Sequence, residues 1–204
     1  MIESTHASHL RGPSEHSVRN QIVEAATAHF GRYGYEKTTV SNLAKSIGFS
    51  KAYIYKFFDS KQAIGEVICA NRLATVMETI DAMVSDALTA SEKLRALFRG
   101  LAGASSDLFF HDRKLYDIAA VAARGQWPPV KRYEERLREV VTQIILVGRE
   151  AGEFERKTPL DEVVHTIYLV MRSSINPVQM QYNLKMAGEA SMHLCALILR
   201  SLSP

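Results

Sequence analysis

The sequence has few of the residues that cross-link, anchor or interrupt a fold. Its 204 residues include two cysteines, one tryptophan and six prolines. Cys69 and Cys195 are too few for a disulfide framework, so we expect both to be buried in a reducing cytoplasm. No run of about 18 apolar residues occurs, and no membrane-spanning helix is expected. Met1-Ile2-Glu3 opens a polar segment, in which no signal peptide is expected.

The motifs of common catalytic sites are also missing. The sequence contains no glycine-rich phosphate loop, no GxSxG, no HExxH and no paired cysteine ligands. His111 and Asp112 are adjacent, but a helix boundary is expected there and favours a cap over a catalytic pair. His6, His9 and His16 match the spacing of no usual metal site. We therefore expect no enzyme, no catalytic residue, no cofactor and no metal.

The strongest pattern that is present lies in residues 38–61. Thr38 or Thr39 can cap a helix there, because a threonine hydroxyl accepts from an orphan backbone N–H. Gly48 can end that helix in the left-handed conformation. The apolar residues between these signals fall at i, i+3, i+4 and i+7, which is one helical face: Val40, Leu43, Ala44 and Ile47.

A second short helix is expected directly after this turn. Ser50 can cap it, and Ile54 and Phe58 lie four apart on its buried side. Asp59 or Ser60 can cap the helix that follows. Two short helices joined by a three-residue turn that contains glycine predict a helix-turn-helix.

The outer face of the second helix carries the residues expected to contact DNA. In this motif the second helix lies in the major groove, and its N-terminal residues contact base edges. Ala52 lets the backbone come close, while Lys51 and Tyr53 can reach bases. Tyr55 and Lys56, with Lys61 in the next helix, are expected to contact phosphates, which fix the register. The predicted DNA-binding set is Thr38, Thr39, Ser50, Lys51, Ala52, Tyr53, Tyr55, Lys56 and Lys61.

This segment resembles the DNA-binding head of the tetracycline-repressor-like (TetR) family. The family pattern is roughly Thr-Thr, then Gly-Val-Ser-Lys-Gly-x-Leu-Tyr-x-x-Phe-x-x-Lys. Here it stands as Thr38-Thr39, followed by GFSKAYIYKFFDSK over residues 48–61. Phe49 replaces a smaller aliphatic residue and Ala52 replaces the usual glycine; neither threatens the fold, and both can alter which operator is bound. A helix-turn-helix of this size also occurs in helical proteins that bind no DNA, but the long run of matched positions favours DNA binding.

The charge distribution agrees with this resemblance. Residues 1–61 hold eight lysines and arginines against five acids, while the remaining residues are balanced. The whole net charge of +3 therefore lies in the predicted head, as expected of a surface that meets phosphates.

The rest of the chain predicts an all-α fold with about nine helices. Residues 1–15 lack periodicity and are expected to form a flexible arm. Residues 16–61 are expected to be the DNA-binding domain and residues 62–204 a helical ligand-binding and dimerisation domain. We expect helices at about 17–33, then 60–85, 91–110, 112–124, 128–150, 159–175 and 186–202, with Thr158 as the cap of the helix at 159.

The body carries more large apolar side chains than a spacer needs, and a ligand pocket is mostly apolar. Large residues at helical spacing are also typical of a core, so each assignment is a hypothesis, and the family resemblance implies the pocket more strongly than they do. The predicted pocket residues are Met77, Phe109, Phe110, Trp127, Tyr168, Met171 and Arg172.

Residues 194–199 of the last helix are apolar on every side, and a helix that is apolar all round must be buried all round. The simplest partner is a second copy, which gives a four-helix bundle about a two-fold axis. The predicted dimer residues are Leu194, Leu197 and Ile198.

Together these patterns predict a sequence-specific DNA-binding regulator. The resemblance implies a homodimeric repressor that a small, largely apolar ligand releases from a palindromic double-stranded operator. A transcriptional activator, a regulator without a ligand, and a helical protein-interaction dimer without DNA binding remain as alternatives.

Overall fold

The computed structural model describes residues 15–111, 113–180 and 187–204; the side chains of residues 108–114, 173–174 and 179–187 lie outside this description. Every element in these residues is a helix, which confirms the expected all-α fold. The predicted arm lies outside the described residues except for Glu15, which begins α1. The helices are α1 (Glu15–Tyr33), α2 (Val40–Ser46), α3 (Lys51–Ile54), α4 (Lys61–Asp86), α5 (Ala90–His111), α6 (Arg113–Arg124), α7 (Pro128–Glu150), α8 (Leu160–Ile175), α9 (Pro177–Met180) and α10 (Ala187–Ser201).

Hydroxyl caps set the helix boundaries in the first part of the chain. The Thr39 side chain accepts from the backbone N–H of Asn42 at the start of α2. Ser50 caps α3 and Ser60 caps α4 in the same way. These three caps confirm the boundaries expected from the sequence, and for α2 they select Thr39 over Thr38.

Two boundaries later in the chain differ from expectation. Pro159 is the N-cap of α8, so Thr158 lies one residue too early for its hydroxyl to reach the first turn, and the expected threonine cap is wrong. The short α9 was not expected. Asn176 accepts from the N–H of Val178, and Pro177 occupies the first helical position, so the sequence that ends α8 also starts α9.

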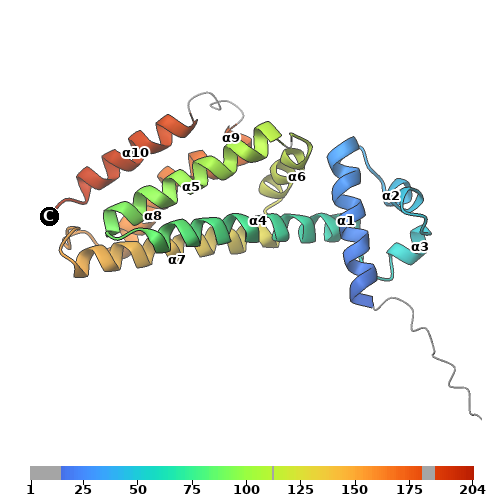
Figure 1. Cartoon of the computed structure of the whole chain (residues 1–204), viewed down its shortest axis with the longest axis horizontal. Helices are drawn as coiled ribbons and strands as arrows, with labels where there is room; N and C mark the ends of the chain where they lie inside the picture. The colour runs from blue at the N-terminus through green and yellow to red at the C-terminus, as the bar shows by residue number, and fades with distance from the viewer. Residues whose placement is uncertain (1–14, 112, 181–186) are drawn as a thin grey trace, which may run out of the picture.

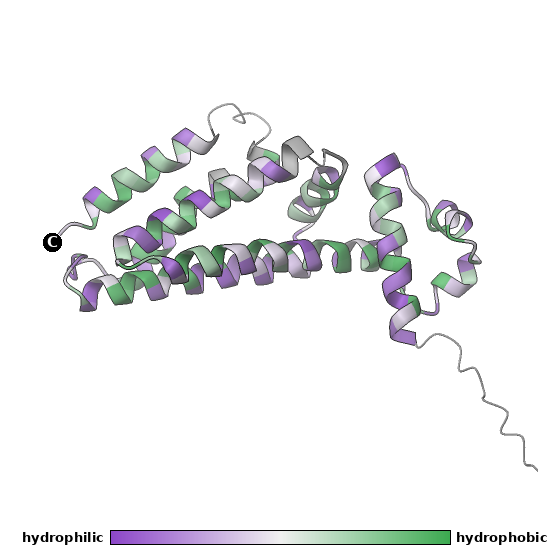
Figure 2. Cartoon of the chain, in the orientation of Figure 1, coloured by the Kyte–Doolittle hydropathy of each residue, from purple (hydrophilic) through white to green (hydrophobic). Residues whose placement is uncertain are grey.

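The helices bury two hydrophobic clusters, one at each end of the molecule. The head cluster joins α1, α2 and α3 to the first turns of α4 and to α6; its fully buried members include Ile22, Phe30 and Ile54. The body cluster lies among α4, α5, α7, α8 and α10. Figure 1 shows α4 running the length of the body, with its N-terminal end against α1. Hydrophobic and hydrophilic residues share the surface of each long helix (Figure 2), as expected where one face is buried.

An aromatic contact between Tyr35 and Trp127 lies at the junction of the head and the body, which we call the seam. The Trp127 indole lies 5.6 Å from the Tyr35 ring, centroid to centroid, and packs over Gly65 of α4. A Cβ at Gly65 would lie 3.0 Å from both rings, so only glycine leaves room for this contact. The loop before α2, the start of α4 and the start of α7 therefore meet at one point.

The structure confirms that the two cysteines are buried, as their small number predicts. Cys69 and Cys195 are free and buried. Burial raises the pKa of the Cys69 thiol to about 11, and the charge of Glu66 adds to this. Both side chains therefore act as small apolar groups. None of the helices in the described ranges is long and apolar enough to cross a membrane.

The start of α5 is capped twice. Thr89 and Glu92 form a reciprocal capping box, in which each side chain accepts from the other's backbone N–H. Glu153, from the loop after α7, accepts from the N–H groups of Ala90 and Ser91 at 2.8 and 3.0 Å. This carboxylate therefore ties the α7–α8 loop to the positive end of α5.

Glu153→Ala should lower the free energy of unfolding by about 1 kcal/mol, because two N–H groups lose their acceptor. Burial acts to raise the pKa of Glu153, but the bonds from Ala90 and Ser91 outweigh it and the pKa is lowered. The contribution is therefore present above the ordinary carboxyl pKa of 4.5 and is lost as the pH falls below it. Urea unfolding of both proteins at neutral and acidic pH tests this, and a gap that persisted unchanged in acid would contradict it.

Candidate nucleic-acid interface and internal cavity

The surface of α3 is open to solvent, except on the side that packs into the head. Ser50, Lys51, Ala52 and Lys56 are exposed, and Tyr55 is 43% exposed. Ile54 points inward and is fully buried. The Lys51 ammonium lies 5.6 Å from the Tyr55 ring, so these two predicted contacts stand together on one face. This face is short, polar and cationic, as a major-groove helix requires.

Tyr53 is held by aromatic neighbours on both sides. Its ring makes edge contacts with Phe49 at 5.0 Å and with Phe57 at 5.3 Å, and it is only partly exposed. Phe49, which departs from the family pattern, therefore fixes the orientation of the neighbouring side chain. Because these neighbours already restrict the Tyr53 ring, the side chain would lose little conformational entropy on contacting a base.

Arg19 on α1 is a residue that sequence reasoning missed. Its guanidinium donates to the carbonyl of Phe57 at 2.7 Å and lies 4.3 Å from the Phe58 ring centroid. It thereby fixes the turn after α3 against α1. No local pattern marks it, since the contact spans 38 residues of sequence.

Thr38 and Lys61 serve the inside of the head in this structure. Thr38 is 2% exposed, and its hydroxyl donates to the carbonyl of Gly34 at 2.8 Å, so its side chain does not face outward. The Lys61 ammonium donates to the carbonyls of Tyr35 and Thr38, both at 3.0 Å, and lies 4.4 Å from the Tyr35 ring. Burial is the main cause that lowers its pKa. The geometry therefore favours a positioning role for Lys61, which holds the loop before α2 against α4, over the predicted phosphate contact.

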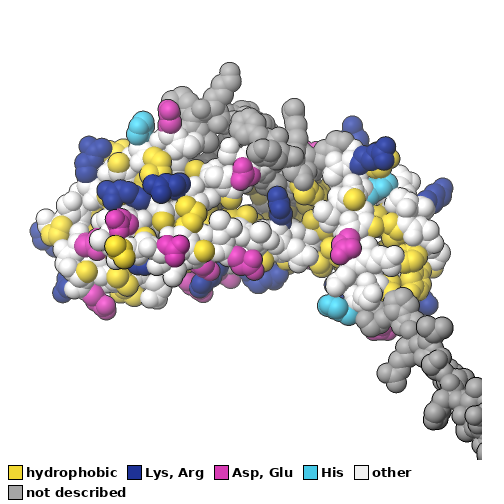
Figure 3. All heavy atoms as spheres, viewed as in Figure 1, with side chains coloured by type: hydrophobic (Ala, Val, Ile, Leu, Met, Phe, Trp, Pro, Cys, Tyr) yellow, Lys and Arg dark blue, Asp and Glu magenta, His cyan; other side chains and the backbone are white. Residues whose placement is uncertain are grey.

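The outer end of the head carries further cations. Lys37 and Lys45 are exposed, in addition to Lys51 and Lys56. Figure 3 shows dark-blue lysine and arginine side chains along the edge of the head that lies away from the body, while the body surface mixes both signs. This distribution matches the charge excess found in the sequence.

The body contains a cavity of about 480 Å³ between α4, α5 and α6. This volume lies within the range of about 300–1,000 Å³ that is typical of small-molecule sites. A smaller cavity of about 90 Å³ adjoins it towards α7 and α9. The main cavity is lined by Ile68, Cys69, Arg72, Leu73, Thr75, Val76, Thr79, Met83, Arg99, Gly100, Gly103, Ala104, Asp107, Leu115, Ile118 and Ala119.

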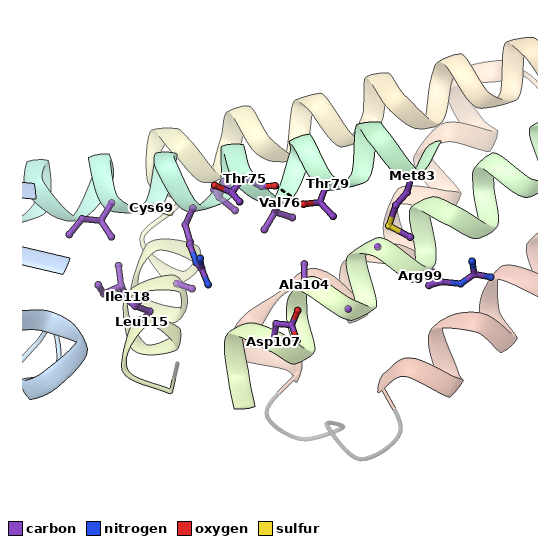
Figure 4. Close-up of a pocket in the computed structure, with 16 residues that line it drawn as sticks. Cys69, Thr75, Val76, Thr79, Met83, Arg99, Ala104, Asp107, Leu115 and Ile118 are labelled. Carbon is purple, nitrogen blue, oxygen red and sulfur yellow. Dashed lines mark hydrogen bonds between the residues drawn. The ribbon is translucent and has the colours of Figure 1, made fainter. Parts of the chain in front are cut away.

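Figure 4 shows Thr75 and Thr79 on α4, and Arg99 and Asp107 on α5, among the residues around the cavity. Thr75 and Thr79 are exposed. Arg72, Arg99 and Asp107 are exposed. The hydroxyl of Thr79 donates to the carbonyl of Thr75 at 3.0 Å, one helical turn back, as the dashed line shows. The rest of the lining consists of apolar side chains, including the Cys69 thiol, and of glycine backbone.

Five of the residues predicted to form a pocket have described side chains, and none of the five lines this cavity. Met77 and Met171 are buried in the body core, and Tyr168 is buried under the Arg138 guanidinium at 3.8 Å. Trp127 belongs to the seam with the head, and Arg172 is exposed. The side chains of Phe109 and Phe110 lie outside the described residues. The sequence argument selected large side chains, which fill space, whereas the cavity lies where α5 carries glycine and alanine.

The predicted dimer residues differ in exposure. Leu197 is 56% exposed and Leu194 is partly exposed, so both are open to a partner. Ile198 is 9% exposed and packs in the core of its own chain. On the neighbouring α8, Leu169 is 49% exposed. One side of α10 is therefore buried in its own chain, and the other side is exposed. Burial of the exposed side by a second copy stays a prediction.

Among the described residues, no three histidine, cysteine, aspartate or glutamate side chains come close enough to hold a metal ion.

The chain was compared with known families, sequences and structures. Residues 22–67 match the family model of bacterial regulatory proteins of the tetR family, and residues 90–192 match a tetracyclin repressor-like C-terminal domain. The transcriptional regulator YhgD of Bacillus subtilis is 35% identical over 78 residues, which are 38% of this chain and 41% of YhgD. The negative regulator IcaR of Staphylococcus aureus is 39% identical over 49 residues, which are 24% of this chain and 26% of IcaR.

The chain thus spans less than half of the length of these curated relatives. Among solved structures, the regulator FadR of Bacillus subtilis in complex with stearoyl-CoA has a TM-score of 0.67 at 18% identity, with 90% of this chain and 98% of that chain covered. At this identity the likeness shows the fold alone, which is the all-α fold with an N-terminal helix-turn-helix.

Lys61→Met and Lys56→Met form a matched pair that separates positioning from phosphate contact. Lys61→Met should lower the free energy of unfolding by about 1–2 kcal/mol, because two carbonyls lose a charged donor. It should leave the salt dependence of binding to duplex DNA unchanged. Lys56→Met should leave stability unchanged and reduce the slope of log affinity against log salt by about 0.9. Urea unfolding and titration of a labelled duplex at several salt concentrations measure both, and equal slopes for the two variants would refute the assignment.

Proposed function

The chain belongs to the TetR family of bacterial regulatory proteins, and from this premise we propose a homodimeric repressor that a small, largely apolar molecule releases from a palindromic operator. The family consists of transcriptional regulators and not of enzymes, as the sequence predicted. The observation that carries the proposal is the capped α2–α3 pair, with Lys51, Ala52 and Lys56 exposed on its cationic outer face. Cytoplasmic location stays a prediction.

In the proposed complex, α3 lies in the major groove. Ala52 allows close approach, Lys51 and the edge of Tyr53 contact bases, and Thr39, Ser50, Tyr55 and Lys56 contact the sugar-phosphate backbone. Arg19, Thr38 and Lys61 hold the two helices in position from behind. Two such heads, one turn or about 34–36 Å apart, require a two-fold symmetric site.

The proposed dimer forms through α8 and α10, where Leu169 and Leu197 are exposed. Exposed leucines on two helices that contact each other are typical of an interface that a second copy covers. The two-fold axis of such a bundle would also relate the heads, which links the dimer to the symmetry of the operator.

Release is proposed to act through α6. Ile118 lines the cavity and also packs in the head cluster, and Leu115 lines the cavity and packs against that cluster. A ligand that binds one arrangement of α4 and α6 more tightly than the other would shift the spacing of the heads. The stearoyl-CoA bound by FadR supports an effector with a large apolar part. An activator, or a regulator without a ligand, would use the same head. These alternatives differ from the proposal in how DNA binding affects transcription or in whether a ligand releases the DNA.

Selection of binding sites from a random duplex library with the purified protein tests the head and its symmetry together. We expect a palindrome with half-sites about one turn apart. Recovery of no enriched sequence by a folded, dimeric protein, with and without cell extract as a source of ligand, would contradict the proposal. It would favour a helical protein-interaction dimer instead.

Leu197→Glu should break the dimer, because it places a charge in an apolar contact. Leu88→Glu is the matched control, since Leu88 is 90% exposed and belongs to the loop between α4 and α5 and not to α8 or α10. Light scattering should give half the mass for Leu197→Glu and an unchanged mass for the control. An unchanged mass for both variants would place the interface elsewhere.

A further inference from the structure

Two glycines stand three residues apart in the middle of α5, and only one of them is explained by packing. A glycine inside a helix is about 1 kcal/mol less favourable than alanine. At Gly100 a Cβ would lie 3.1 Å from Cγ1 of Ile80 and 3.4 Å from the sulfur of Met83, so α4 and α5 approach closely there. At Gly103 nothing lies within 4 Å of the position that a Cβ would take. The fold of the chain therefore tolerates a larger residue at 103.

Gly103 is exposed and lies on the open side of the cavity between α4, α5 and α6. It lines this space together with Ala104 on α5 and Ala119 on α6. Side chains of ordinary size at these three positions would project into the volume that is now open. The small residues thus maintain a space that contributes nothing to the stability of the free protein.

We propose that Gly103 determines which effector the cavity admits, by leaving the α5 backbone bare on the open side of the cavity. This inference rests on the proposed function, since it names the ligand class and a specificity-determining residue of the same cavity. A residue with a side chain at 103 would narrow the space between α4 and α5 without disturbing either helix.

The lining also sets the chemistry of the part that is enclosed. The Thr75 and Thr79 hydroxyls already donate to carbonyls of their own helix, and the Cys69 thiol is neutral. In the described part of the chain, the buried side-chain polar atoms without a partner belong to Tyr168 and Ser191, on α8 and α10, and neither residue lines the cavity. The rest of the lining is mostly apolar, so we expect the part of the ligand that contacts it to be apolar. Any charged or strongly polar group of the ligand would lie near Arg72, Arg99 or Asp107, which are exposed.

The test is a series of substitutions read with a neutral aromatic probe, N-phenyl-1-naphthylamine, whose emission rises in apolar surroundings. The full-length protein should bind it. Gly103→Ala should change the affinity less than about threefold, Gly103→Leu should weaken it, and Gly103→Phe should weaken it by about tenfold or more, in the order of side-chain volume. If Gly103→Phe does not fold, the Leu variant decides.

Gly31→Ala and Gly31→Phe are the matched controls, because Gly31 lies within α1 and a Cβ there also meets nothing within 4 Å. Both alanine variants should raise the melting temperature by a similar amount through helix propensity. The Gly31 variants should bind the probe as the original chain does.

Three results would overturn the inference: no binding of the probe by the original chain, equal affinity across the Gly103 series, or equal losses in the Gly31 series. Each leaves the operator selection unaffected. A failed selection, in turn, refutes the proposed function while the probe series still measures the cavity. With a selected operator in hand, Gly103→Phe should retain DNA binding and lose its response to apolar compounds that release the original chain.

Discussion

The packing of α4 into two separate cores is the constraint on which the rest of the structure depends. Its first turns contribute Ile64 and Ile68 to the head cluster, and its later turns contribute Met77 and Ile80 to the body cluster. Because the helix between these contacts is continuous, neither cluster can rotate about α4 without disturbing the other. The head is therefore presented to DNA at an orientation that the body sets, and a change in the body is carried by a rigid element and not by a linker.

The cavity lies beside the part of α4 that connects the two clusters. It is bounded by the middle of α4 and by α6, and α6 also packs against α1. Tight packing makes such an arrangement switch between discrete states more readily than it deforms gradually. The positions that leave space, Gly103 and Ala104, stand on α5, which packs against α4 but is not part of the head cluster. In the proposed mechanism, the residue that selects the ligand lies on α5, whereas transmission to the head goes through α4 and α6.

Local signals in the sequence were enough to predict the starts of α2, α3 and α4 and the exposed face of α3. Thr39, Ser50 and Ser60 act within three residues of sequence, and a one-dimensional pattern contains all that is needed to place them. The roles of Lys61, Arg19 and Trp127 were not predictable in this way, since their partners lie more than twenty residues away. The predicted pocket residues with described side chains do not line this cavity, for a different reason. Hydrophobic pattern identifies the side chains that fill a core, whereas an empty volume is marked by the side chains that are absent.

The seam at Trp127 has a consequence for how the molecule can be observed. The chain has one tryptophan, and its indole is packed between the Tyr35 ring and the bare backbone of Gly65. Every photon of indole emission therefore originates at the junction of α4, α7 and the loop before α2, which separates the two cores. The protein thus carries its own fluorophore at the junction of the head and the body, and its indole emission reports the state of that junction without any label.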